Sequence, residues 1–137
     1  MIEQLLIAFL TIAGCAPENR EYLVWGSSGS SVVESVAVPP DRVWLVRAAG
    51  AATTQGTQTR YALELIRPVL SQGGACCWRI PIEGMSENNS TPPKALSRPI
   101  VLLPGEKLAV RVNAIVSPNK AAILFVYYDV PKSCIGL

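Results

Sequence analysis

The chain has 137 residues, half of them hydrophobic and 16% charged, with a net charge of +2 and no histidine. This length suits one domain, the scattered basic residues disfavour a nucleic-acid surface, and the missing histidine removes the commonest general base and metal ligand. A charged fraction of 16% is below the roughly 25% usual for soluble domains. We therefore expect part of the surface to be covered by another molecule.

The first fourteen residues, MIEQLLIAFLTIAG, are apolar on almost every side. A secretory signal is one interpretation, and Ile12–Cys15 resembles a bacterial lipobox, but the segment carries Glu3 and no basic residue. A membrane span is another, but about 20 apolar residues are needed, so we expect no span. The third is a segment buried against its own domain or a partner chain, which we favour.

We therefore divide the chain into an apolar N-terminal arm or helix with a linker over residues 1–20 and one β domain over residues 21–137. Burial of large apolar side chains is strongly favourable, and leaving them in water invites aggregation. We expect the arm to bind a partner through its large side chains, namely Leu5, Leu6, Phe9, Leu10 and Ile12.

Short apolar runs separated by Gly and Pro turns fill the rest of the chain and predict about eight strands. Loops are expected over Gly50–Gln58 and Gly84–Ser97, which lack an apolar period. A single all-β sandwich is the fold that such a pattern indicates, and eight strands are typical of a jelly roll. The expected strands are Glu21–Trp25, Ser31–Val38, Arg42–Ala48, Thr59–Arg67, Ala75–Ile82 and three within Arg98–Asp129.

The last three strands have the clearest pattern. Turns are predicted at Pro104-Gly105 and at Ser117–Lys120, because proline presets φ and glycine accepts a positive φ. Between them, Leu108, Val110 and Val112 alternate with polar or small residues, which places the aliphatic side chains on one face. The final strand, Ala121–Tyr128, is apolar at nearly every position, so we expect both of its faces to be covered.

No pattern indicates catalysis, a cofactor or a metal. A nucleophile needs an activating base, and glycoside hydrolysis needs two facing carboxylates. Glu64 is the one acid in the middle of an expected strand, where Tyr61, Leu63 and Leu65 alternate with it, and we predict that Glu64 is exposed to solvent. The sequence therefore favours a binding or structural role over an enzyme.

The four cysteines, Cys15, Cys76, Cys77 and Cys134, include no C-x-x-C pair. A zinc site would need all four thiolates from distant positions. We favour small buried thiols in a reducing cytosol. A Cys15–Cys134 disulfide that joins the two ends of the chain is an alternative.

Several segments in order resemble small β-sandwich proteins of tailed-phage virions, including capsid decoration (cement) proteins and head or tail accessory proteins. These segments are a valine-rich strand before Pro39-Pro40-Asp41, the strand RVWLVR, an Ala/Thr/Gly loop, RPIVLLPGEKL and a final LFVYY. The resemblance covers roughly Ser31–Val130. It implies a virion protein that forms a homo-oligomer, with a trimer favoured, and binds neighbouring major capsid protein subunits.

Other interpretations remain open at this point. One is an envelope lipoprotein acylated at Cys15, and another is a carbohydrate-binding sandwich in which tryptophans stack on sugars. An enzyme on a jelly-roll frame is disfavoured by the absence of histidine.

Overall fold

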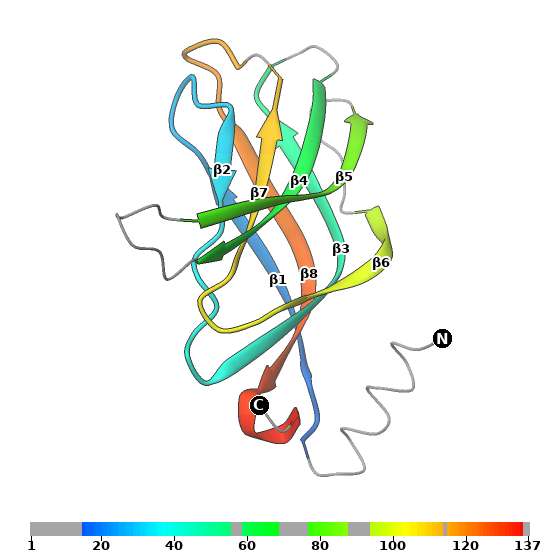
Figure 1. The fold of residues 1–137 in the computed structure, drawn as a ribbon. Coiled ribbons are helices and arrows are strands. Elements are labelled where there is room, and N and C mark those ends of the chain that lie inside the picture. Colours follow the sequence, from blue (N-terminus) through cyan, green and yellow to red (C-terminus); the bar gives the residue numbers. More distant parts are fainter. Residues whose placement is uncertain (1–14, 56–58, 69–76, 88–93, 114, 136–137) are drawn as a thin grey trace.

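The computed structural model describes residues 15–55, 59–68, 77–87, 94–113 and 115–135. Within them, eight strands form two antiparallel sheets that pack face to face (Figure 1). This confirms the predicted all-β sandwich. The elements are β1 (Glu18–Trp25), β2 (Val32–Glu34), β3 (Arg42–Thr53), β4 (Thr59–Pro68), β5 (Cys77–Glu87), β6 (Lys94–Leu102), β7 (Lys107–Val112), β8 (Ala121–Pro131) and a 3-10 helix η1 (Lys132–Ile135).

The strand order identifies the sandwich as a jelly roll. One sheet has the order β1-β8-β3-β6, here called the β8 sheet, and the other has the order β2-β7-β4-β5, here called the β7 sheet. The chain crosses between the two sheets repeatedly, as two Greek keys require. The first and last strands therefore become neighbours in one sheet, with β1 at its edge and Glu18 opposite Asp129.

The core lies between the two sheets and is centred on aromatic side chains of the β8 sheet. The Phe125 ring stacks on the Tyr22 ring at 4.7 Å between centroids and lies 5.4 Å from Tyr127. The β7 sheet contributes aliphatic side chains, and the predicted alternation is confirmed because Leu108, Val110 and Val112 are all buried. Tyr61, Leu63 and Leu65 are buried on the same side of the β7 sheet.

Strand lengths differ from the prediction where local sequence lacks an apolar period. β3 continues through Gly50–Thr53, which was predicted as loop, and these residues pair with Ala121–Leu124 of β8. This stretch of small residues is a strand because β8, the strand beside it, pairs with its backbone hydrogen-bonding groups. The predicted loop Gly84–Ser97 is also too long, since its ends belong to β5 and β6.

Two further boundary errors lie near the start of the chain. β1 begins at Glu18, inside the predicted linker, because residues 18–20 pair with residues 127–129 of β8. β2 spans only Val32–Glu34 instead of Ser31–Val38, because the regular ladder with β7 ends there and the Leu108 amide donates to the Ser35 hydroxyl instead of to a backbone carbonyl. Both boundaries depend on the partner strand, which a local pattern does not reveal.

The turn at Pro104-Gly105 is confirmed. Gly105 has a φ of 85°, and the Glu106 amide donates to the Leu103 carbonyl at 3.0 Å. The Glu106 side chain is buried, and its carboxylate accepts from the Leu103 amide at 2.7 Å and from Arg67 Nε at 2.6 Å. The second turn lies one residue earlier than predicted, with a hydrogen bond from Asn119 to Val116.

Glu106→Ala should lower the free energy of unfolding by about 1–3 kcal/mol, because the Leu103 amide and Arg67 Nε then both lose the buried carboxylate that accepts from them. Urea denaturation measures the change. Asp41→Ala, at an exposed turn position, is the matched control and should change stability by less than about 0.5 kcal/mol. Equal stability of the two variants would contradict this role of Glu106.

Cys15 and Cys134 form a disulfide, with 6.0 Å between their Cα atoms. The favoured prediction of free thiols is therefore wrong for these two residues, and the alternative is correct. The jelly-roll order explains the pairing, because β1 and β8 lie side by side and Cys134 follows β8 in η1. The bond joins the residue three positions before β1 to η1, and the start of β1 and η1 both lie at the bottom of Figure 1.

Candidate binding face

The outer surface of the β8 sheet is largely apolar. The register aligns Leu23 with Leu124, and Tyr128 with Leu45 and Val101, across the strands. Leu23 is 60% exposed, Trp25 46% and Val101 49%, although burial of such side chains is strongly favourable. We call this surface the apolar face, and its large side chains are Leu23, Trp25, Val101, Leu124, Val126 and Tyr128.

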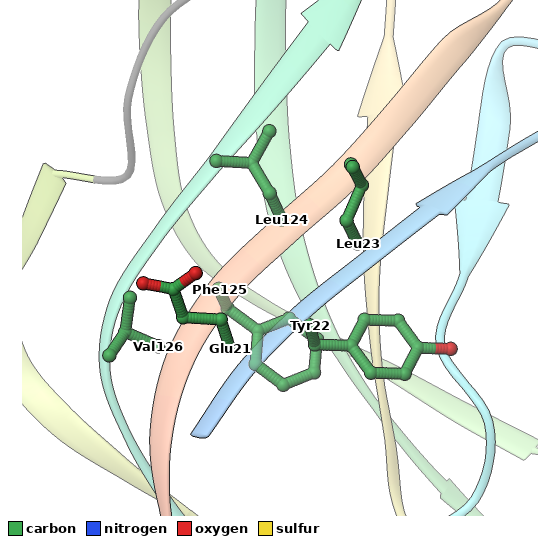
Figure 2. Close-up of a pocket in the computed structure, with 6 residues that line it drawn as sticks. All are labelled: Glu21, Tyr22, Leu23, Leu124, Phe125 and Val126. Carbon is green, nitrogen blue, oxygen red and sulfur yellow. The ribbon is translucent and has the colours of Figure 1, made fainter. Parts of the chain in front are cut away.

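Small side chains leave a shallow depression in the middle of the apolar face. A groove of about 450 Å³ runs beside them over β1 and β8. Figure 2 shows Leu23, Leu124 and Val126 along these two strands, with the rings of Tyr22 and Phe125 next to each other. The small residues are Ala48, Gly50, Ala52 and Ala122. This relief suits a protruding apolar side chain of another polypeptide better than a flat partner surface.

One cation lies on the apolar face. The Arg47 guanidinium carbon is 5.2 Å from the centroid of the Tyr128 ring, and one terminal nitrogen donates to Asn19 Oδ1 at 3.2 Å. The Arg47 Nε is buried and has no hydrogen-bond partner among the described residues. No carboxylate of the described residues forms an ion pair with Arg47. The face therefore offers an unpaired, partly covered cation within an apolar surface.

The outer surface of the β7 sheet has the opposite character. Arg111 donates to Glu64 at 2.9 Å, and Arg79 and Lys107 both reach Glu34, at 2.8 and 3.5 Å. The prediction that Glu64 is exposed is wrong, since its residue is only 7% exposed. Arg111 and Arg79 from the two neighbouring strands lie over it. Paired charges of this kind suit a solvated face.

Two pKa shifts occur beside the disulfide end of the β8 sheet. Burial raises the pKa of Tyr127, and the neighbouring Asp129 raises it further. The hydrogen bond from Arg20 to Glu18 raises the pKa of Arg20. Asp129 itself accepts from Arg42 Nε at 2.7 Å. Near neutral pH the tyrosine therefore stays neutral and the arginine charged, so neither shift creates a group that exchanges protons at that pH.

The predicted partner-binding residues lie outside the described residues, so their role stays a prediction; they are Leu5, Leu6, Phe9, Leu10 and Ile12. Sequence reasoning missed the apolar face, although β8 carried a signal for it. Because β8 is apolar at nearly every position, we expected both of its faces to be buried. On the outer face, however, Leu124, Val126 and Tyr128 are only half-buried. The outer side of β8 is therefore only partly covered by the described part of the chain.

Among the described residues, no three Cys, Asp or Glu side chains gather closely enough to hold a metal ion. The same part of the chain contains no helix of the length and apolarity that a membrane crossing requires. No profile of a known protein family matches the chain, and no curated protein shows significant sequence similarity to it.

Proposed function

We propose that this protein is a structural component of a phage virion, a capsid decoration (cement) protein that binds neighbouring coat subunits. It acts as an oligomer through protein contacts and catalyses no reaction. A head-to-tail or tail accessory role is the nearest variant of the same proposal.

The apolar face is the observation that carries this proposal. Large exposed aliphatic and aromatic side chains over one sheet are typical of surfaces that bind protein, since monomers rarely expose such patches without a use. The outer face of the β7 sheet carries paired charges, so this second broad surface is suited to contact with water. The jelly-roll order is shared by viral coat proteins, lectins and cupins, so it agrees with the proposal without selecting it.

The disulfide also favours a particle or exported setting, because such bonds persist on virions and outside the cytosol. It disfavours a lipoprotein acylated at Cys15, since the Cys15 sulfur is already bonded to Cys134. A sugar-binding role has less support, because Trp44 is buried in the core and the apolar face is mostly aliphatic around Trp25. Sugar sites combine aromatic stacking with several polar groups.

Co-sedimentation with coat shells tests the proposal. Shells assembled from the major capsid protein of the same phage should pellet the full chain, and the shells should melt at a higher temperature when it is bound. Val101→Asp places a charge on the apolar face and should weaken binding at least about tenfold, because the carboxylate must be desolvated. Val116→Asp is the matched control, since Val116 is a valine 65% exposed in the loop between β7 and β8, outside the strands of the apolar face.

Equal binding by the two aspartate variants would show that the apolar face is not used. Failure of the unmodified chain to pellet with any shell, or its absence from purified virions by mass spectrometry, would overturn the virion role. Circular dichroism should show the same β signal for both variants, because both substitutions lie at exposed positions.

A further inference from the structure

We propose that residues 1–14 of a neighbouring copy cover the apolar face, and that Glu3 of this segment pairs with Arg47 of the copy that it covers. This inference deepens the proposed function, on which it rests for its setting in a particle. It concerns contacts between copies of this chain alone, so it can be tested without coat protein.

Residues 1–14 join the domain at a point from which they can reach the apolar face of a neighbouring copy. Cys15 is tied to Cys134 just beyond the end of the β8 sheet, so residues 1–14 begin at the edge of the sheet that carries the apolar face. Fourteen extended residues reach at most about 46 Å, and an eight-residue strand such as β1 spans about 26 Å. The segment is therefore long enough to leave its own domain and cross the face of another.

The apolar surfaces match in extent. Residues 5–12 of the segment hold six large apolar side chains, Leu5, Leu6, Ile7, Phe9, Leu10 and Ile12. At about 100 Å² each they offer about 600 Å², and a comparable area of the face would be covered. The sum is about 1,200 Å², which exceeds the roughly 1,000 Å² expected of a specific interface.

The distribution of apolar residues favours a second copy over the chain's own face. Residues 5–12 are apolar on almost every side, and one flat sheet covers only one side of a segment. Two neighbouring copies can bury both sides of residues 5–12, because a segment that is apolar all round is stable only when every side of it is covered. Exchange of an identical element between copies is an inexpensive route to an oligomer.

The charges are complementary. Glu3 is the only charged side chain in residues 1–14, and Arg47 is the cation on the apolar face that has no carboxylate partner among the described residues. Covering Arg47 with apolar groups alone would leave a desolvated cation unpaired, which is costly. A segment with a single acid among aliphatic residues removes that cost. Glu21 also lines the groove over β1 and β8, but it is exposed on the edge strand, so its carboxylate can point toward solvent at the rim of the face.

Sedimentation velocity of the full chain over a range of concentrations tests the inference. The unmodified protein should self-associate, and a chain that lacks residues 1–14 but keeps Cys15 should remain monomeric. Glu3→Arg and Arg47→Glu should each weaken association at least about tenfold, since each places like charges together. The double variant Glu3→Arg with Arg47→Glu should recover most of the loss, because it restores an opposite pair in reverse.

Two outcomes would overturn the inference. Monomeric full-length protein at every concentration means that no copy covers another, and a lower melting temperature on removal of residues 1–14 would then place the segment on its own domain. Failure of the double variant to recover, with Val116→Asp associating normally, would exclude the Glu3–Arg47 pair. Self-association without binding to coat shells would support this inference and contradict the proposed function. Binding to coat shells by a monomer would support the proposed function and contradict this inference.

Discussion

Replacing both Cys15 and Cys134 by serine should lower the free energy of unfolding by about 4 kcal/mol, close to the upper end of measured disulfide effects. The bond joins residues 119 positions apart, so it restrains almost the whole unfolded chain. In the chain-entropy description, a loop of this size contributes about 4–5 kcal/mol. A loss of this size is a large part of the roughly 5–15 kcal/mol typical of a single domain.

Equilibrium urea denaturation with and without reductant measures the effect. Reductant should destabilise the unmodified protein by a similar amount and should leave the double serine variant unchanged. A difference below about 1 kcal/mol between the oxidised protein and the variant would contradict a native bond of this stabilising size.

Phe125→Ala should lower the free energy of unfolding by about 3–5 kcal/mol. Phe125 is 1% exposed, and its ring contacts the rings of Tyr22, Trp44 and Tyr127 at 4.7–6.2 Å between centroids. Truncation removes the transfer free energy of the ring and leaves a cavity that three large neighbours, themselves fixed in strands, fill only in part.

Leu124→Ala is the matched control for this prediction. Leu124 is the next residue of β8 and points to the outer, apolar face, where it is only half-buried. Its truncation in the isolated protein should cost about 1 kcal/mol or less, because a partly exposed side chain leaves no closed cavity. Thermal unfolding of the two variants side by side measures the contrast, and similar losses would mean that the inner and outer faces of β8 are assigned wrongly.

Local residue chemistry predicted those parts of the fold that depend on near neighbours. The alternation of Leu108, Val110 and Val112 correctly placed one face of β7 in the core, because side chains of a strand point to opposite faces in turn. The Gly105 turn was also correct, since the dipeptide Pro-Gly meets the backbone angles of a tight turn by itself.

Features that depend on distant strands were predicted poorly. Gly50–Thr53 has loop-like composition, yet it is strand because β8 lies beside it and accepts its hydrogen bonds. Glu64 was expected in water, and it is covered because Arg111 reaches it from a strand 47 positions away and Arg79 from the strand that follows β4. The disulfide depends likewise on the adjacency of β1 and β8.

For this protein, the order of the amino acids alone determined the fold class and the number of strands, because strand periodicity and turn chemistry act over a few residues. Only the packed sandwich decided which side chains face outward together. The apolar face, with Arg47 on it and no carboxylate partner for Arg47 among the described residues, arises from the register of four strands drawn from across the chain. The candidate site exists because a sheet brings to one surface residues that are far apart in the sequence.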